Sequence, residues 1–347
     1  MSTKQFDYCS FIGRMNPPHI GHFEVIEKAK KLADKVIILI GSSNQPRTIK
    51  NPFTFEERKA MILAVTPDVT VLPLRDFKAD DNVWASNVQR IVDTEVAKMG
   101  WTDKPRRGTI IGHTKDESSY YLKMFPQWEV IEHGMNEKVS ATDIRDIYFS
   151  SNIRFIKDVV PAPVYEYLQK FKSDVDFSIL VEEYDYLEKY KASWAAAPYA
   201  PTFITADAVV VQSGHILLVK RRAAPGRGLW ALPGGFVNQK EKIEDAMLRE
   251  LREETKLKVP APVLRGNIKE RKVFDAPDRS LRGRTITQAF FIELPAGELP
   301  EIKKARDPND LEDDAEKARW TPLSWVKEEE MFEDHYSICQ HFLGTFN

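Results

Sequence analysis

Hydrophobic positions in the first half of the chain form short apolar runs, separated by longer stretches with a helical pattern. The runs predict strands at residues 8–12, 36–40, 69–74, 109–111 and 128–131, and the longer stretches predict helices at 19–33, 55–65 and 83–99. The uninterrupted run at 36–40 is typical of a strand that is covered on both faces. Strands that alternate with helices of this length predict βαβ units and a parallel sheet.

The second half of the chain has a different pattern. Residues 206–211 and 215–220 predict two strands joined by a turn at Ser213 and Gly214, residues 243–255 predict a helix, and residues 272–274 and 285–294 are extended. This order of elements indicates an α+β domain. The predicted fold class is therefore α/β, with an N-terminal Rossmann-like domain followed by a C-terminal α+β domain.

The segment between the two halves suggests a domain boundary. Residues 150–190 are charged and helical in pattern, with Pro161 and Pro163 as interruptions, and the run AAAPYAP follows at 195–201. Small residues with prolines are common at domain boundaries. We expect a first domain at 1–185, a linker at 186–201 and a second domain at 202–347.

Composition narrows the class of protein. A length of 347 residues suits two domains, and a formal net charge of -2 gives no reason to expect nucleic-acid or membrane binding. Two cysteines, Cys9 and Cys339, fit neither a zinc site nor a disulfide framework. No apolar run approaches the roughly 18 residues that a membrane span needs. We therefore expect a cytoplasmic protein, and the sequence leaves a homo-oligomer open.

A glycine–histidine motif follows the first predicted strand. Gly13 ends that strand, a turn with two prolines comes next, and His19 and His22 open a helix. The glycine lets the backbone approach a ligand, and histidines three positions apart share a helix face. The N–H groups and the dipole at a helix start attract an anion. The motif predicts a phosphate site, and zinc is disfavoured because no third ligand lies nearby.

The stretch GRMNPPHIGH, from Gly13 to His22, resembles the Gly-x-Phe-x-Pro-x-His-x-Gly-His motif of the nucleotidylyltransferase superfamily, with Met15 at the usual phenylalanine position. A second family motif, Ile-Ser-x-Thr-x-x-Arg, is similar to residues 139–145. In this second motif, Ser140 suits a helix N-cap and Arg145 suits a phosphate. The two motifs lie at the two ends of the first domain, as in that superfamily.

Within the superfamily, residues 5–170 most resemble nicotinamide-mononucleotide adenylyltransferases of the archaeal-like type, with support from residues 51–53, 57–58, 81–84 and 111–121. The resemblance implies that the catalytic residues are His19, His22 and Arg145. It implies that ATP or its phosphates contact Gly13, Arg14, Arg47, Gly112, Ser140 and Thr142. It also implies that Asn82 and Trp84 bind the nicotinamide nucleotide, with Trp84 stacked on the nicotinamide ring. Core packing is the alternative for Trp84.

The reaction that this resemblance implies transfers the adenylyl group of ATP to nicotinamide mononucleotide and gives NAD and pyrophosphate. No protein nucleophile takes part, so positioning and charge stabilisation, aided by Mg²⁺ (or Mn²⁺), account for catalysis. The chain has no Gly-x-x-x-x-Gly-Lys-Ser/Thr loop, which excludes a P-loop enzyme. Nicotinic acid mononucleotide stays open as an alternative acceptor.

A run of acidic residues marks the second half. Glu250, Glu253 and Glu254 are spaced so that a helix places all three carboxylates on one side. Hard divalent cations such as Mg²⁺ or Mn²⁺ prefer oxygen ligands and stabilise such crowding. A solvated helix face is the alternative reading for Glu253 and Glu254 taken alone.

The wider pattern resembles the Nudix box, a motif of pyrophosphate-cleaving enzymes. The residues in register are Gly235, Glu241, Arg249, Glu250, Leu251, Glu253, Glu254 and Leu257. The resemblance implies that Glu250, Glu253 and Glu254 bind metal and that Glu253 and Glu254 are catalytic. Lys256 replaces the usual glycine. Because lysine disfavours a positive-φ helix cap, we expect a different helix end there.

The flanking stretches 272–284 and 332–335 resemble ADP-ribose pyrophosphatases, and this similarity covers residues 200–345. The implied reaction hydrolyses ADP-ribose to AMP and ribose 5-phosphate, and a broader dinucleotide or sugar-nucleotide pyrophosphatase is the alternative. The general base varies in this family. Asp313, Asp314 and Glu316 are candidates from an acidic loop, which is otherwise a solvated loop.

Together the two motifs predict a bifunctional enzyme of NAD metabolism whose ligands are ATP, nicotinamide mononucleotide, NAD and ADP-ribose, with divalent metal in both domains. The non-enzymatic alternative is a regulator that senses ADP-ribose without cleaving it. Such a regulator needs a DNA-binding module, and the sequence shows neither a basic recognition helix nor a basic arm.

Overall fold

The computed structural model describes residues 4–77, 81–100, 105–112, 117–134, 140–150, 152–302 and 315–344, apart from the side chains of residues 117–119, 315 and 316. The chain forms two compact units, Met1–Val181 and Glu182–Asn347. Helix α6 (Val175–Ser193) begins in the first unit and ends in the second. The first part of the segment expected as a linker, 186–201, is therefore helical.

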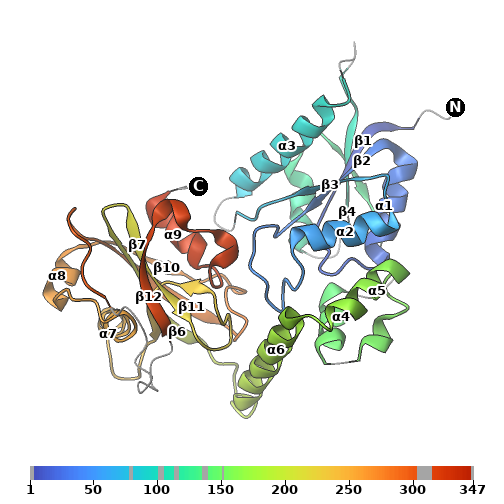
Figure 1. Cartoon of the computed structure of the whole chain (residues 1–347). Coiled ribbons are helices and arrows are strands. Elements are labelled where there is room, and N and C mark those ends of the chain that lie inside the picture. Colours follow the sequence, from blue (N-terminus) through green and yellow to red (C-terminus); the bar gives the residue numbers. More distant parts are fainter. Residues whose placement is uncertain are drawn as a thin grey trace. The chain divides into compact units, whose positions relative to one another are not determined.

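The first unit contains a parallel sheet (Figure 1) whose described strands run in the order β3-β2-β1-β4-β5. These strands are β1 (Phe6–Gly13), β2 (Ala33–Ile40), β3 (Thr70–Pro73), β4 (Gly108–Gly112) and β5 (Glu129–Glu132). Strand β1 is central and pairs with β2 on one side and β4 on the other. The predicted parallel sheet is thus confirmed, and β1 lies where the strand order reverses, which is where ligands bind in open α/β sheets.

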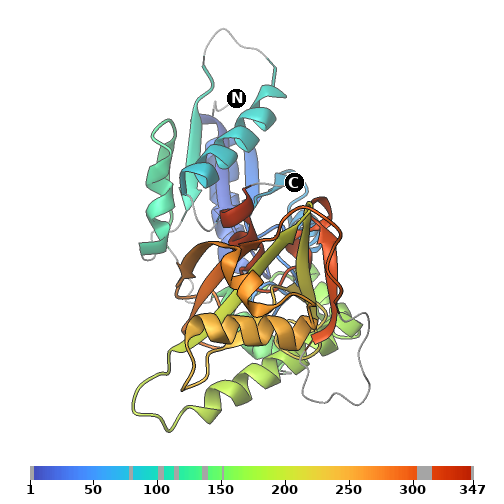
Figure 2. The same cartoon turned by 90° about the vertical axis from the view of Figure 1, so that its left-hand side faces the viewer.

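Helices cover both faces of this sheet. They include α1 (Ile20–Leu32), α2 (Phe55–Val65), α3 (Asp81–Ala97) and the 3₁₀ segment η1 (Glu117–Met124). Side chains alternate between the faces of a strand. Tyr8, Ile37 and Leu39 form a buried cluster with α3 and η1, and α3 lies in front of the sheet in Figure 2. Cys9 and Ile38, at the alternate positions, are fully buried on the face that α1 covers.

Four further segments complete the first unit: α4 (Ala141–Phe149), η2 (Ile153–Ile156), α5 (Ala162–Phe171) and the start of α6. An aromatic cluster joins them to the loop before α2. The ring centroids of Phe53 and Phe171 are 5.2 Å apart, and those of Tyr148 and Phe177 are 5.0 Å apart. This packing holds α4, which carries the second sequence motif, in a fixed place.

The second unit is built on a mixed sheet in which the order is β10-β11-β6-β7-β12, with β8 beside β7 and β9 beside β6. The strands are β6 (Phe203–Gln212), β7 (His215–Arg221), β8 (Trp230–Ala231), β9 (Gly234–Phe236), β10 (Ile268–Phe274), β11 (Thr285–Glu293) and β12 (Ala315–Pro322). β6 and β11 are parallel, whereas β6 and β7 are antiparallel. Ser213 and Gly214 form the predicted turn, with φ of 47 and 72 degrees.

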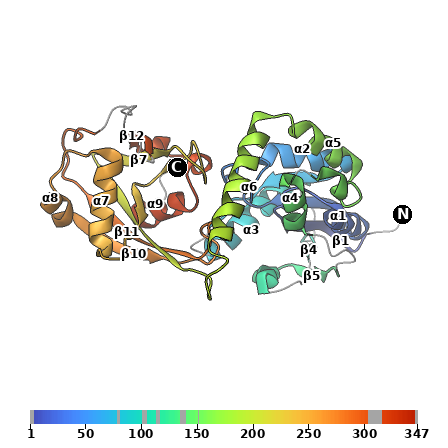
Figure 3. The same ribbon diagram turned by 90° about the horizontal axis from the view of Figure 1, so that it is seen from below.

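Helices also cover both faces of this second sheet: α7 (Ile243–Thr255) and α8 (Ala261–Gly266) on one, and α9 (His335–Leu343) on the other. Ala208 and Val210 of β6 pack with Leu251 of α7, whereas Val209 packs with Ile338 of α9. Figure 3 shows α7 and α9 on opposite sides of the sheet. The short segments η3 (Leu323–Trp325) and η4 (Glu328–Glu330) precede α9.

None of the helices in the described part of the chain has the length and apolarity that a membrane crossing requires. Both cysteines are buried and free of disulfides.

Candidate active sites

The first candidate site lies at the carboxyl edge of the parallel sheet. The Gly41 N–H, just after β2, donates to the Gly13 carbonyl at the end of β1 (3.1 Å). A fully buried arginine, Arg58 of α2, ties these strand ends together. Its guanidinium donates to the carbonyls of Arg14 (2.7 Å), Gly41 (2.8 Å) and Ser42 (3.0 Å). The loop that carries the first motif is therefore fixed by a residue to which the sequence assigned no role.

The two motif histidines meet at the start of α1, as their spacing predicts. Their ring centroids are 3.8 Å apart. His19 is the N-cap residue, and its N–H donates to Nδ1 of His22 (3.2 Å). Because Nδ1 of His22 accepts this bond, a neutral His22 carries its proton on Nε2. Gly21 leaves room for the His19 ring, because a Cβ added at position 21 would lie only 3.3 Å from that ring.

Arg145 joins the second motif to the first. Its Nη1 donates to the Asn16 carbonyl (2.9 Å), and its Nη2 donates to Oγ1 of Thr142 (3.1 Å). The structure therefore brings together two motifs that lie more than a hundred residues apart in the sequence. Ser140 caps α4 as expected, and its hydroxyl donates to Asp143 (2.7 Å).

The charges at this edge favour an anion. Burial and the neighbouring charge of Arg14 together lower the pKa of Arg145 to about 10. Burial likewise lowers the pKa of Arg58 to about 10, with Arg14 adding to this effect and Asp76 opposing it. A phosphate beside Arg14 and Arg145 would relieve the repulsion between their charges. The arrangement suits an enzyme that holds phosphates by charge and hydrogen bonds.

The first unit also contains the predicted residues Gly112, Trp84 and Asn82. Gly112 ends β4, and a Cβ there would lie 3.0 Å from Leu122. Trp84 is half-buried, with its ring 5.9 Å from that of Tyr121 and 6.0 Å from that of Phe125, and Asn82 is exposed. The part of the supporting stretch at 113–116 lies outside the described residues.

Arg47 is engaged elsewhere in this structure. Its Nη1 lies 2.9 Å from Glu57, its Nε lies 2.9 Å from Asp176, and its guanidinium lies over the ring of Phe171. A phosphate would have to displace these carboxylates before Arg47 could bind it. The phosphate role of Arg47 therefore stays a prediction from the resemblance.

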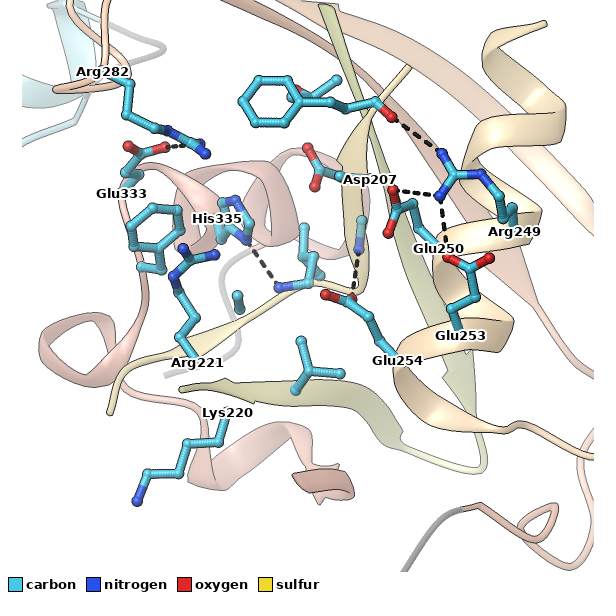
Figure 4. A pocket seen from close by; sticks show the side chains of 18 of the residues that line it. Asp207, Lys220, Arg221, Arg249, Glu250, Glu253, Glu254, Arg282, Glu333 and His335 are labelled. Atoms are coloured by element: carbon cyan, nitrogen blue, oxygen red, sulfur yellow. Dashed lines mark hydrogen bonds and ion pairs between the residues drawn. The ribbon is translucent and has the colours of Figure 1, made fainter. Parts of the chain in front are cut away.

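The second candidate site is a pocket of about 460 Å³ in the second unit (Figure 4). Helix α7 lines one side with Glu250, Glu253 and Glu254 of the Nudix box, and Lys220 and Arg221 at the end of β7 line another. Glu333, just before α9, and His335, the first residue of α9, also line the pocket. The volume is in the range of small-molecule sites.

Arg249 organises the carboxylates of the box. Its guanidinium contacts Glu241 (2.7 Å), Glu250 (2.7 Å) and Glu253 (3.1 Å). It also donates to the Phe236 carbonyl (3.1 Å), which joins the loop to the helix. Hydrogen bonding to Arg249 lowers the pKa of Glu241 to about 2. Arg249 therefore orients carboxylates, as its place in the motif suggests.

Glu254 projects toward the pocket floor, where Oε2 accepts from the Gly234 N–H (3.0 Å). Loss of solvent raises the pKa of Glu254 well above its usual value, and the charges of Glu250 and Asp207 raise it further. Burial raises the pKa of Asp207 to about 6. These carboxylates gather at a place where a cation would stabilise them.

The donor atoms fit a hard divalent cation, because they are carboxylate oxygens. Among the described residues, however, no group of three or more histidine, cysteine, aspartate or glutamate side chains stands close enough to hold a metal ion. Arg249 instead neutralises Glu250 and Glu253 in this structure. Binding of Mg²⁺ or Mn²⁺ would require these two carboxylates to turn from Arg249 to the metal. The expected base candidates Asp313 and Asp314 lie outside the described residues, as does the side chain of Glu316.

The expectation for Lys256 was wrong. Lys256 caps α7 in the left-handed conformation that the usual glycine takes, with φ of 52 and ψ of 31 degrees. Its N–H donates to the Arg252 carbonyl (2.9 Å), so the helix ends as in the usual motif. Hydrogen bonding and packing of the flanking residues outweigh the strain at a non-glycine residue.

Several residues of this site had no role assigned from the sequence. Arg279 and Asp334 form a buried ion pair (2.8 Å), and Nδ1 of His335 accepts from the Leu232 N–H (2.9 Å). Because these partners are far apart in sequence, no spacing rule could pair them.

The fold and the two sites define a class: a two-domain nucleotide-handling enzyme that combines a phosphate-binding Rossmann-like unit with a Nudix unit. A cytidylyltransferase-like family model matches residues 10–147, and a NUDIX domain model matches residues 201–342. A nicotinamide/nicotinic acid mononucleotide adenylyltransferase of Acinetobacter baylyi is 33% identical over 52% of this chain and 94% of its own length.

An ADP-ribose pyrophosphatase of Methanocaldococcus jannaschii is 32% identical over 46% of this chain and 81% of its own length. The crystal structure of a bifunctional NMN adenylyltransferase/ADP-ribose pyrophosphatase from Francisella tularensis, complexed with AMP and manganese, has 35% identity and a TM-score of 0.87, and covers 97% of this chain and 98% of that chain. The chain belongs to the family of bifunctional nicotinamide-mononucleotide adenylyltransferase/ADP-ribose pyrophosphatases.

Proposed function

We propose that the first unit transfers the adenylyl group of ATP to nicotinamide mononucleotide, giving NAD and pyrophosphate, and that the second hydrolyses ADP-ribose to AMP and ribose 5-phosphate. One observation supports this most strongly. Each unit has its own site of suitable charge, a basic strand edge in the first and an acidic pocket in the second. Relatives of both halves are named for these activities.

In the adenylyl transfer, a phosphate oxygen of the mononucleotide attacks the α-phosphorus of ATP, and pyrophosphate leaves. The chain supplies no nucleophile for this step. Arg14 and Arg145 hold phosphate oxygens, and the paired rings of His19 and His22 stabilise charge that develops on them. Arg58 acts through the backbone that it holds and is a positioning residue.

In the hydrolysis, a water molecule attacks one phosphorus of the diphosphate and the P–O bond to the other phosphate group breaks. A divalent cation bound to the box carboxylates would activate the water and neutralise phosphate charge. Arg249 orients Glu250 and Glu253, and the Gly234 N–H fixes Glu254. We propose Mg²⁺ or Mn²⁺ for both units.

Two finer points stay predictions. We expect nicotinamide mononucleotide to be preferred over the nicotinic acid form, although the relative from Acinetobacter baylyi is named for both. We also propose a cytoplasmic location, because two free and buried thiols suit a reducing compartment. A homo-oligomer stays open.

A product assay on the full chain tests the proposal. ATP with nicotinamide mononucleotide should give NAD, and ADP-ribose should give AMP. EDTA should abolish AMP release, and Mg²⁺ or Mn²⁺, added singly, should restore it. Calorimetric binding of ADP-ribose without AMP release in either metal would contradict the hydrolase and favour a sensor. Absence of NAD formation with either mononucleotide would contradict the transferase.

A further inference from the structure

Glu333 has three unusual features in one residue. Its φ is 46 degrees, in the left-handed region that residues other than glycine rarely adopt. Only 8% of its side chain is exposed. Its Oε1 is buried and has no hydrogen-bond partner among the described residues, so the Ser280 hydroxyl, which hydrogen-bonds to this carboxylate, leaves one oxygen unsatisfied. Strained backbone and unsatisfied buried carboxylates are both uncommon in native structures, and both concentrate at functional sites.

The neighbours of Glu333 hold it in this conformation. The Phe332 N–H donates to the Trp230 carbonyl (2.8 Å), and the Arg221 guanidinium lies over the Phe332 ring at 4.0 Å. On the other side, Asp334 is fixed by its buried ion pair with Arg279. Because both flanking residues are anchored, the chain turns sharply at Glu333 and directs its side chain to the pocket wall.

Glu333 lies across the pocket from the metal-binding helix. Figure 4 shows Glu250, Glu253 and Glu254 on one side of the pocket and Glu333 with Arg282 on the other. The acidic helix is the place for the metal and the diphosphate. The opposite wall is therefore left to meet a non-phosphate part of the substrate.

The chemistry of this wall fits a sugar. Glu333 can only accept hydrogen bonds when ionised, and Arg282, 3.9 Å away, can only donate them. A ribose hydroxyl both donates and accepts, so it can satisfy the two groups together. A base amino group only donates and needs a flat apolar face beside it, whereas the nearby Phe236 ring already lies against the Arg282 guanidinium (5.1 Å).

We propose that Glu333 is a specificity-determining residue of the Nudix site, and that its carboxylate accepts a hydrogen bond from a ribose hydroxyl of the nucleoside-diphosphate substrate. The inference rests on the proposed pyrophosphatase function and names the sugar as a recognised part of the substrate. Rotation about the last side-chain bond of Glu333 lets either oxygen face the ligand.

The test uses the full chain with Glu333→Gln, which keeps the size of the side chain and removes its charge. Glu330→Gln, an exposed change in the same segment, is the matched control. Glu333→Asn is a second variant, because asparagine tolerates a positive φ. Melting curves show whether each variant is folded. The substrates are ADP-ribose, its 2′-deoxyadenosine analogue, an analogue whose terminal sugar is 2-deoxyribose, and the inosine analogue.

We expect Glu333→Gln to lower kcat/KM for ADP-ribose by about 10- to 100-fold, mainly through KM, because a hydrogen bond to a charged group is lost. One of the two deoxy analogues should be a poor substrate for the wild type. Its kcat/KM should fall little further in Glu333→Gln, because the hydroxyl that Glu333 recognises is already missing. That analogue identifies which ribose Glu333 recognises. Glu330→Gln should match the wild type.

Three results would overturn the inference. Unchanged kinetics in Glu333→Gln would remove the role altogether. An equal loss of kcat on every substrate, with the acidic limb of the pH profile removed, would make Glu333 a general base. A loss that vanishes only with the inosine analogue would indicate recognition of the base. Calorimetric titration of ADP-ribose into the wild type and Glu333→Gln measures Kd directly, so this part of the test does not depend on turnover. If the wild type binds without cleaving, the pyrophosphatase proposal fails, while a weaker Kd in Glu333→Gln still supports recognition.

Discussion

Gly235 shows, at the scale of a single residue, why the pocket needs a position without a side chain. A Cβ at Gly235 would lie 2.5 Å from Oε1 of Glu250, so any larger residue there would displace that carboxylate from its present place. The same residue precedes Phe236, whose carbonyl is bound by Arg249. The loop that carries Gly235 is thus bonded to α7 at the point where the two come closest. A methyl group at position 235 would push Glu250 out of place.

We therefore predict that Gly235→Ala lowers pyrophosphatase kcat/KM by at least about 10²-fold, since small misplacements of positioned groups cost that much. NAD synthesis should be unchanged. Gly266→Ala is the control, because nothing lies within 4 Å of a Cβ at that site. Steady-state assays of both activities measure the effect. Wild-type hydrolysis by Gly235→Ala would show that Glu250 can move without loss.

Single residues also show what the sequence can reveal. The contact of His19 with His22 follows from helix geometry, so their spacing predicted it. Arg58 gave no such signal, because its acceptors are backbone carbonyls of Arg14, Gly41 and Ser42, which any residue could supply. Glu333 was noticed only as part of a resemblance, because neither its backbone conformation nor its burial is visible in sequence.

At the scale of elements, α7 (Ile243–Thr255) begins and ends where its pattern predicts. Its cap is the exception, because Lys256 adopts a left-handed conformation. The short elements β8, β9 and α8 were not predicted, since two to six residues carry too little periodicity to recognise. Strand β12 was not predicted either, and the antiparallel pairing with β7 is what establishes it as a strand.

The cap of α7 gives a stability prediction. A residue other than glycine in the left-handed region costs about 1–2 kcal/mol, and glycine recovers this at a smaller entropic cost. Lys256→Gly should therefore raise the free energy of unfolding by about 0.5–1 kcal/mol. Urea denaturation of the full chain, monitored through the loss of pyrophosphatase activity, measures this change in the free energy of unfolding. Lys258→Gly, whose φ is not positive, should destabilise, and equal effects of the two changes would contradict the reasoning.

The contact between α3 and η1 bears on acceptor binding. Trp84 is half-buried and meets Tyr121 and Phe125 edge-on or tilted, which leaves part of its ring exposed. Stacking on an aromatic ring is worth about 1–3 kcal/mol per base. We predict that Trp84→Ala raises KM for nicotinamide mononucleotide by roughly tenfold or more and changes KM for ATP less.

Trp84→Phe separates stacking from packing, since it retains an aromatic face and should restore most of the acceptor affinity. Melting curves of both variants monitor the core. Competition between the two mononucleotides should favour the nicotinamide form. An unchanged acceptor KM in Trp84→Ala would remove the stacking role, and equal or better use of the nicotinic acid form would remove the preference.

At the scale of the whole molecule, the two units were separable in the sequence because their hydrophobic patterns differ. The parallel sheet of the first unit and the α+β class of the second were both predicted, whereas the mixed strand directions of the second sheet were not, and each motif lies in the unit expected for it. The boundary itself was less clear. Helix α6 (Val175–Ser193) continues past the last residue of the first unit, Val181, because its charged, helical pattern does not change there.

If one chain carries two chemically independent sites, variants at each site should separate the two activities. His22→Ala removes a charge-stabilising group of the first site, and Glu254→Gln removes a carboxylate of the second. Each should lower its own activity by about 10²–10³-fold, the usual cost of losing one preorganised group. The measurement is the rate of NAD formation and of AMP release from the same preparation of each variant. We expect His22→Ala to lose only NAD formation and Glu254→Gln to lose only AMP release. Loss of both activities in either variant, or of neither, would contradict it.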